Sequence, residues 1–346
     1  MHLFRRLFLA SIGALAVAAM PSAHAADPIA DFYGKTPISI FVASGPGGGF
    51  DAYARVLAPH LRRHVPGTPN IIIRNMPGAT GLVAMNYIYN SGPKDGSAII
   101  ASFNTAVLSP LFGDPNAKFD PRDMDWLGSI GKQTGVCLTW GTAPIKSLAD
   151  AQGMETLVGA TGEGAAPVMF PKLLNAMMGT RFKVITGYST PGLRLAVENQ
   201  EVHGICGISW ETHMASVPNW ILDKKVQFIA QLGLTRSAHL PDVPMAIELI
   251  QNEDNKEIYH LLAIQEEIGR PFLVPPKTDP DRLKTLQTAF AQTLKDPAYQ
   301  ADAARAGQFI EPLTPDEAKA LVNRAYAAPP PILKRAAEYS GGPNGN

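Results

Sequence analysis

The chain has 346 residues, of which 46% are hydrophobic and 17% are charged, and its formal net charge is zero. A disordered chain would be poorer in apolar residues, and a nucleic-acid-binding chain would carry a basic excess, so we expect neither. The length corresponds to about two domains of ~100–200 residues each. The two cysteines, Cys137 and Cys206, are too few for a four-cysteine zinc cluster.

The N-terminal segment has the three zones of an export signal. Arg5 and Arg6 are basic, residues 7–19 form an apolar run, and residues 23–25 (Ala-His-Ala) fit the cleavage pattern. The run is shorter than the ~20 residues that span a bilayer, which argues against a membrane anchor. We predict that residues 1–25 are a cleaved signal peptide and that the mature chain is periplasmic. The arginine pair leaves the export route open between the general secretory and twin-arginine pathways.

Export also bears on the two cysteines. An oxidising compartment permits Cys137 and Cys206 to pair. Each falls in its own predicted strand, and the sequence does not place the two strands relative to each other. We expect two separate core cysteines rather than a disulfide.

The first third of the chain alternates short apolar strands with amphipathic helices. Strands are predicted at 38–43, 71–73 and 98–101. This alternation predicts parallel strands joined by crossover helices. The helices are predicted from the periodic residues Tyr53, Leu57 and Leu61, and again from Leu82, Met85 and Tyr89.

The remainder repeats this alternation and then becomes helical. Strands are expected at 136–140, 156–160, 182–185, 202–206 and 226–230, and helices near 170–178 and 190–199. Asp279-Pro280 opens a helix that Asp296-Pro297 ends, and residues 314–317 are a capping box that opens the last helix. The tail from Ser340 is expected to be loose. Because no linker separates two α/β domains, we expect the chain to cross between them more than once.

Three loops that follow predicted strands carry the chemistry. Residues 44–51 (Ser-Gly-Pro-Gly-Gly-Gly-Phe-Asp) run from a strand into a helix, and residues 160–165 (Ala-Thr-Gly-Glu-Gly-Ala) run toward another. Glycines leave backbone N–H groups accessible, and a helix N-terminus adds partial positive charge, so each loop predicts an anion cradle. Residues 102–105 add polar side chains and an aromatic ring. The alternative is that these are ordinary tight turns.

Other site chemistries find less support. Residues 47–52 formally match a dinucleotide fingerprint, but the next strand ends in Arg74-Asn75 without the acidic ribose partner. No lysine follows the glycines as a phosphate loop requires, and no nucleophile motif is present. His60 and His64 have metal-ligand spacing beside two arginines, and we expect a solvated helix end there. Trp140, Trp210 and Trp220 are expected to be packing residues, of which Trp210 is best placed for a pocket wall.

Six segments, in their order and spacing, resemble a known family. They are 46–51 (Pro-Gly-Gly-Gly-Phe-Asp), 75–81 (Asn-Met-Pro-Gly-Ala-Thr-Gly), 93–96 (Pro-Lys-Asp-Gly), 160–164, 187–189 (Gly-Tyr-Ser), and Arg236 with 240–244 (Leu-Pro-Asp-Val-Pro) and Glu248. Over nearly the whole mature chain the sequence is similar to the extracytoplasmic solute-binding receptors of tripartite tricarboxylate transporters, the Bug family.

The resemblance implies an α/β, two-lobed periplasmic-binding-protein fold of type II, each lobe a mostly parallel sheet flanked by helices. The implied lobes are 26–131 with 232–346, and 132–231. A small carboxylate would be held in the cleft by loop N–H groups and bridging waters, without a metal, cofactor or catalytic residue. The implied ligand-binding residues are Ser44, Gly48, Gly49, Phe50, Asp51, Phe103, Asn104, Thr105, Thr161, Gly162, Glu163, Gly164, Ala165, Tyr188, Gly207, Ile208, Ser209 and Trp210.

Three departures from the family pattern affect the ligand. Gly207 stands where the resemblance leads us to expect an acidic side chain, and Glu163 puts a carboxylate in the second glycine loop. Pro167 and Pro171 do not fit one helix start, so the loop before the helix is expected to be longer. The family resemblance implies a di- or tricarboxylate. The departures favour a ligand outside this usual class, and the aromatic residues Phe50, Phe103, Tyr188 and Trp210 make an aromatic acid the alternative.

Three functions remain open at this stage. The first is a monomeric receptor whose lobes close on a carboxylate and which docks to transporter subunits in the membrane. The second is a secreted enzyme that uses the glycine loops as an oxyanion or phosphate site. The third is a sensor whose closed form docks to a receptor kinase.

Overall fold

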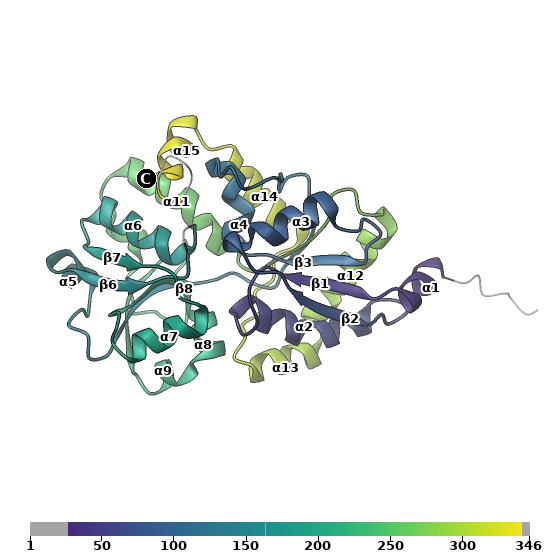
Figure 1. Ribbon diagram of the computed structural model, residues 1–346, viewed down its shortest axis with the longest axis horizontal. Helices are drawn as coiled ribbons and strands as arrows, with labels where there is room; N and C mark the ends of the chain where they lie inside the picture. The colour runs from purple at the N-terminus through teal and green to yellow at the C-terminus, as the bar shows by residue number, and fades with distance from the viewer. Residues whose placement is uncertain (1–26, 163, 341–346) are drawn as a thin grey trace, which may run out of the picture.

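The computed structural model describes residues 27–162 and 164–340, and these form two lobes that lie side by side (Figure 1). Each lobe is built on one five-stranded sheet with helices packed against it. The α/β, two-lobed fold that we expected is therefore confirmed. The predicted signal peptide, Glu163 and the tail beyond Ser340 lie outside the described residues.

The first sheet has the order β2-β1-β3-β10-β4. Strands β1, β2 and β3 pair in parallel, whereas β10 pairs antiparallel with both of its neighbours. Four strands thus run in one direction and β10 runs in the other. The strands span Ile38–Val42 (β1), Ile71–Asn75 (β2), Ala98–Ala101 (β3), Asp125–Ser129 (β4) and Pro271–Val274 (β10).

The second sheet repeats this plan in the order β7-β6-β8-β5-β9, and here β5 is the reversed strand. In each sheet the reversed strand is the first one that the chain forms after it arrives from the other lobe. The predicted strand at 202–206 begins two residues later and runs on to Ser209. The strands span Gly135–Trp140 (β5), Thr156–Gly159 (β6), Phe182–Ile185 (β7), Gly204–Ser209 (β8) and Val226–Gln231 (β9).

Local sequence signals account for several helix starts. Asp279 caps one helix and Thr314 forms the predicted capping box with Glu317. That helix is not the last, because Pro330 opens a further one. The helices are α1 (Pro28–Lys35), α2 (Gly49–His64), α3 (Leu82–Ser91), α4 (Asn104–Leu108), α5 (Leu148–Gly153), α6 (Ala166–Met178), α7 (Thr190–Glu198), α8 (Trp210–Ser216), α9 (Pro218–Leu222), α10 (Ala246–Leu249), α11 (Glu253–Ile268), α12 (Pro280–Lys295), α13 (Pro297–Arg305), α14 (Pro315–Tyr326) and α15 (Pro330–Ala337), with short 3-10 turns η1 (Ala79–Gly81) and η2 (Ser109–Phe112).

The two cysteines form a disulfide, so the expectation of separate core cysteines is wrong. Cys137 of β5 and Cys206 of β8 are direct partners across an antiparallel pair, and their Cα atoms lie 3.8 Å apart. The two strands are 69 residues apart in the chain, and their adjacency follows from the reversed insertion of β5, which local sequence patterns do not reveal. Both cysteines are buried.

Within the described residues the backbone crosses between the lobes at two segments, and these are hydrogen-bonded to each other. Residues 130–134 lead into β5, and α11 with Arg270 leads back into β10. The Arg270 N–H donates to the carbonyl of Gly131 (3.1 Å), and the Gln133 N–H donates to the carbonyl of Glu266 (2.8 Å). We call these two segments, 130–134 and 266–270, the crossing segments.

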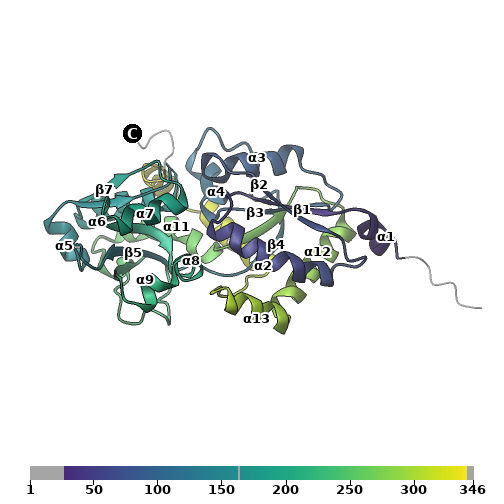
Figure 2. The same cartoon turned by 60° about the horizontal axis from the view of Figure 1, so that its bottom comes forward.

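Apolar packing continues across the junction of the lobes. α11 lies at that junction (Figures 1 and 2), where Tyr259 and Leu262 belong to a buried cluster with residues from both sheets. On another side of the junction, α8 of the second lobe lies beside the start of α2 in the first (Figure 2). The junction therefore brings the strand-end loops of both lobes to face one another.

Candidate functional site

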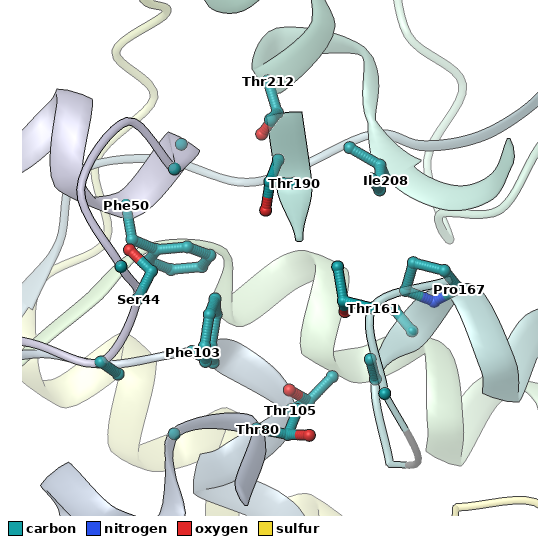
Figure 3. Close-up of a pocket in the computed structure, with 18 of the residues that line it drawn as sticks. Ser44, Phe50, Thr80, Phe103, Thr105, Thr161, Pro167, Thr190, Ile208 and Thr212 are labelled. Atoms are coloured by element: carbon teal, nitrogen blue, oxygen red, sulfur yellow. The ribbon is translucent and has the colours of Figure 1, made fainter. Parts of the chain in front are cut away.

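A cavity of about 610 Å³ lies between the lobes, a volume within the usual range for small-molecule sites. Figure 3 shows Ser44, Phe50 and Phe103 on the side of the first lobe and Thr161, Pro167 and Ile208 on the side of the second. Both lobes therefore contribute wall residues. The implied binding residues that line it are Ser44, Gly48, Gly49, Phe50, Phe103, Asn104, Thr105, Thr161, Gly162, Ala165, Tyr188, Gly207, Ile208 and Ser209.

Asp51 does not line the cavity, contrary to expectation, but holds the first loop in shape. Its carboxylate accepts hydrogen bonds from the Gly47 N–H and the Arg55 side chain through one oxygen (both 2.9 Å) and from Asn75 through the other (2.8 Å). Burial alone would raise the pKa of this carboxyl, but these hydrogen bonds outweigh it and lower the pKa. The Asn75 side chain also donates to the Ser44 carbonyl (2.9 Å). Asp51 and Asn75 together fix the backbone from Ser44 to Gly47.

The loop between β2 and α3 also forms part of the wall, although we quoted it from sequence only as a family motif. Residues 77–81 line the cavity. Ala79 and Thr80 have positive φ angles of 44° and 51°, a left-handed conformation that is uncommon outside glycine. Such a backbone turns the segment inward instead of letting it continue β2. In the sequence, only the family motif at 75–81 pointed to this part of the site.

Two aromatic rings meet at the first-lobe side of the cavity. The rings of Phe50 and Phe103 pack edge to face with centroids 4.8 Å apart, and both line the wall. Asn104 follows at the start of α4, where its side-chain amide donates to the carbonyl of Gln265 in α11 (2.9 Å). The aromatic pair gives the cavity an apolar surface between its polar loops.

The second glycine loop leads directly into α6, which corrects the expectation of a longer loop. α6 begins at Ala166 and contains both prolines. Pro167 stands in the first turn, where no N–H is needed, and Pro171 lies further inside the helix. Thr161, Gly162, Ala165, Ala166 and Pro167 therefore reach the cavity. Gly164 is described but does not line it, and Glu163 lies outside the described residues.

Gly207 lines the cavity at a position that admits no side chain. Its φ is +123°, and a Cβ there would lie 2.5 Å from the carbonyl oxygen of Ala166. The close approach of α6 to β8 thus explains the absence of the acidic residue that the family resemblance led us to expect. The neighbouring wall comes from Tyr188, Ser189, Thr190 and Pro191 at the start of α7, and from Ile208, Ser209 and Thr212 at the start of α8.

Trp210 packs at the junction of the lobes and does not line the cavity, so its predicted place in the wall is wrong. Its ring stacks on His239 with centroids 4.4 Å apart and also contacts Phe309. Trp140 and Trp220 pack against each other as expected of packing residues. The residue of α8 that lines the cavity is Thr212, two positions after Trp210. The sequence put an aromatic residue near the strand end but did not reveal which way it faces.

Three helix N-termini point positive partial charge at the cavity, whose described wall has no basic side chain. α2, α6 and α7 all begin there, since their N-cap residues Gly48, Ala165 and Ser189 line it. Each helix N-terminus carries roughly half a positive charge and free N–H groups. No Lys, Arg or His is among the lining residues that the structure describes. The arrangement suits an anion whose oxygens accept backbone hydrogen bonds.

A buried arginine stands behind this wall. Arg270, at the return crossing, is 1% exposed, and its Nη2 donates to Thr212 Oγ1 (3.1 Å) and Ser209 Oγ (3.4 Å). Its guanidinium lies over the Tyr53 ring, 3.9 Å from the centroid. Arg270 thus links the first lobe to α8 and adds positive charge behind the cavity.

One acidic residue that the sequence analysis missed is part of the wall. Glu266 of α11 lines the cavity and is 2% exposed. Burial raises the pKa of its carboxyl to about 8, and the negative charge of Glu211 adds to the effect. No motif marks this position, because an acidic pair at 266–267 within a helix has the pattern of a solvated surface.

The remaining sequence candidates have structural roles. His60 is 3% exposed and hydrogen-bonded to Asp302 (2.8 Å), so the expected solvated helix end is wrong for this residue. Within residues 27–162 and 164–340, no group of three His, Cys, Asp or Glu side chains is arranged to hold a metal. Arg236 forms an ion pair with Glu248 (2.5 Å) and donates to the Val243 carbonyl (2.8 Å), away from the cavity.

The sequence matches a family model described as the tripartite tricarboxylate transporter family receptor over residues 53–321. The chain belongs to this family. A curated relative of this receptor-family chain is Protein BugT of Bordetella pertussis, which is 25% identical over 309 residues, covering 86% of this chain and 88% of BugT. Receptors of this family are periplasmic solute-binding proteins, and they are not enzymes.

Solved structures share the fold of this receptor-family chain. The periplasmic binding protein BugD has a TM-score of 0.67 at 19% identity, covering 89% of this chain and 98% of BugD. MatC from Rhodopseudomonas palustris, solved with bound malate, has a TM-score of 0.65 at 18% identity, covering 88% and 99%. The R. palustris protein Rpa4515, solved with adipate, has a TM-score of 0.68 at 19% identity, covering 89% and 98%. In the part of the chain that is described, no helix has the length and apolar character to cross a membrane.

Proposed function

We propose that the protein is a periplasmic receptor that captures a small carboxylate in the interlobe cavity and delivers it to the membrane subunits of a tripartite tricarboxylate-type transporter. The observation that carries the proposal is the convergence of α2, α6 and α7 N-termini on one cavity whose described wall has no basic side chain. Such a site binds an anion through backbone N–H groups. Capture requires no chemical change of the ligand.

The ligand contacts both lobes and thereby favours the closed state, because only that state makes both sets of contacts. The crossing segments serve as the hinge. The sequence placed the return to the first lobe at residue 232, and with the hinge at the crossing segments we propose lobes of 26–131 with 271–346 and of 132–265. The proposed form is a monomer, after removal of residues 1–25. The lining residues named above are the proposed contacts, with Asp51 acting through the shape of the first loop.

The ligand class follows from the wall. The glycine loops suit carboxylate oxygens, and the Phe50–Phe103 pair with Tyr188 provides apolar surface between them. MatC and Rpa4515 were solved with malate and adipate, which supports a dicarboxylate for this chain. Aromatic acids belong in the same screen because of the aromatic pair.

A thermal-unfolding screen tests the proposal. The mature chain is unfolded and refolded to remove co-purified ligand, and is then heated with citrate, malate, adipate, glutamate or benzoate. A ligand at a hundred times its Kd adds about 2.7 kcal/mol, which raises the Tm by several degrees. Uncharged amides of the same acids serve as controls and should leave the Tm unchanged. Recovery of the acid unaltered excludes turnover. The absence of a shift with every carboxylate contradicts the proposal.

A further inference from the structure

Among the described residues that line the cavity, Glu266 is the only one of the types Asp, Glu, Lys, Arg and His. It belongs to a crossing segment, in the last turn of α11. Its backbone carbonyl accepts from the Gln133 N–H (2.8 Å), and Gln133 also lines the cavity. Glu266 therefore stands where the wall meets the hinge, apart from the loops that present helix N-termini.

The Glu266 carboxyl has one occupied oxygen and one that is available. Oε2 accepts a hydrogen bond from the Gly135 N–H at 2.8 Å. Oε1 accepts none from the residues that the structure describes, and no Lys, Arg or His nitrogen among them lies within 4.0 Å of the carboxyl. A carboxylate that is buried without a cationic partner loses hydration that nothing replaces, so the neutral acid is favoured.

The two neighbouring carboxylates, Glu211 and Glu267, act in the same direction. Glu211 on α8 lies nearby, its carboxylate accepting from the Thr134 N–H (3.0 Å). Glu267 on the same helix is paired with Lys132 (2.8 Å). Among cations, Arg270 favours ionisation, but its Nη2 is directed to Thr212 and Ser209.

The remaining titratable neighbour is the buried Tyr259 of α11. Its hydroxyl donates to the Leu232 carbonyl (2.8 Å), and burial, with the charge of Glu266 as a smaller cause, raises the pKa of the phenol. Tyr259 is therefore neutral, like Glu266. Taken together, burial and the neighbouring charges disfavour the ionised form of Glu266, which agrees with the raised pKa of its carboxyl.

On the basis of the proposed function, we propose that Glu266 is a specificity-determining residue whose neutral carboxyl donates a hydrogen bond from Oε1 to an oxygen of the bound ligand. One ligand carboxylate then lies on the helix N-termini, and a second oxygen acceptor, from another carboxylate or a hydroxyl group, meets Glu266. An ammonium group is disfavoured there, because it needs a negative or acceptor partner and its binding would include the cost of ionising the buried Glu266 carboxyl. The cavity thus prefers oxygen acids to amino acids.

Binding should therefore depend on pH in one direction. Malate and adipate serve as probes because both are fully ionised above about pH 6.5. Their Kd should be constant from pH 6.5 to 7.5 and should then rise by up to tenfold per pH unit above pH 8, since one proton on Glu266 is lost. Aspartate, the amine-bearing counterpart of malate, should bind at least tenfold more weakly than malate.

Two substitutions at Glu266 separate hydrogen-bond donation from charge. Glu266→Gln keeps a carbonyl for the Gly135 N–H and an N–H donor toward the ligand, so affinity at pH 7 should stay within threefold while the loss above pH 8 disappears. Glu266→Leu removes the donor and should weaken binding at least tenfold. Glu211→Gln leaves Glu266 in place but removes a neighbouring negative charge, so the fall in affinity should begin at lower pH.

A measurement on the ligand-free protein makes the test independent of folding defects. Since the folded protein keeps Glu266 protonated and the unfolded chain does not, wild-type stability should fall between pH 5 and pH 8 relative to Glu266→Gln. The Tm advantage of the Gln variant should therefore grow with pH. An equal Tm difference between the two proteins at pH 5 and at pH 8 overturns the claim that the folded protein keeps Glu266 neutral.

The outcomes distinguish the two proposals. If malate or adipate binds but Glu266→Gln abolishes binding, or affinity rises with pH, the donor role of Glu266 is overturned and the receptor function stands. If neither they nor any other carboxylate binds to the refolded protein, the receptor function fails and the role of Glu266 fails with it.

Discussion

Gly49 of α2 and Thr212 of α8 approach so closely across the two lobes that a Cβ at Gly49 would lie 2.9 Å from Thr212 Oγ1. Both residues line the cavity, and Thr212 is in turn held by Arg270 (3.1 Å). The absence of a side chain at Gly49 thus sets how near the lobes come on this side of the cavity.

Replacement of Gly49 by alanine should wedge the lobes apart. Overpacking at a tight contact costs about 1–3 kcal/mol, and we expect this cost to appear in ligand binding, with a Kd at least fivefold higher by calorimetry. Gly153→Ala is the matched control, because a Cβ at Gly153 meets no atom within 4 Å. Equal affinities of the two variants would show that this contact does not limit closure.

Asp51→Asn should destabilise the protein and weaken ligand binding, although Asp51 does not touch the cavity. The substitution weakens the charge-assisted hydrogen bonds to Gly47 and Arg55, which we expect to cost about 1–3 kcal/mol in chemical denaturation. Arg55→Gln removes only the half-exposed partner of this ion pair and should cost at most about 1 kcal/mol. If both variants lose the same stability and affinity, the ion pair rather than the Gly47 contact shapes the loop.

The Cys137–Cys206 disulfide should contribute to stability but not to ligand affinity. It closes a long loop, and removal of such a bond costs about 2–4 kcal/mol, so the double Cys→Ser variant should melt several degrees lower. Neither cysteine lines the cavity, and the Kd should be unchanged. Alkylation of the denatured, unreduced protein should modify no thiol, and after reduction it should modify both. Two reactive thiols before reduction would contradict the bond.

His213 should make the protein sensitive to acid. Burial, with a contribution from the charge of Arg194, lowers the pKa of its imidazole to about 3. Below pH ~6.5 the unfolded chain takes up a proton that the folded protein does not, so stability falls as the pH falls, by about 2.7 kcal/mol at pH 4.5. His213→Gln should remove this loss. The control is His260→Gln at an exposed site, which should leave the pH dependence as it is.

The fold could be predicted from sequence wherever local chemistry decides it. Thr314 and Glu317 formed their capping box, and Asp279-Pro280 opened its helix, because these signals act within one turn. The strands β4 and β10 were not predicted. β4 contains Asp125 and Gly128 and does not stand out as an apolar run. β10 is apolar but short, and it begins with Pro271, which is unusual inside a sheet. The cysteine pair was missed for a related reason, since pairing between remote strands is not local information.

The site could be predicted as loops but not as individual side chains. Glycine loops after strands were expected to line a cleft, and the lining of the cavity by Gly48, Phe103 and Gly162 accords with this expectation without testing ligand binding. The direction of a side chain depends on its packing. Asp51 turns back to Gly47, and Trp210 turns to His239, as no spacing rule indicates. Glu266 is brought to the wall by the return of the chain, which is again a matter of tertiary structure.

The hydrogen-bonded crossing segments have a mechanical consequence. Gln133 and Glu266 belong both to these segments and to the cavity wall, so a molecule that fills the cavity reaches the axis about which the lobes would turn. Near an axis, a difference of a few tenths of an ångström in ligand length becomes a much larger displacement at the far rims, as along a lever arm. The angle between the lobes would then depend on the length of the captured acid, and a partner that contacts the outer edges of both lobes would bind according to that length.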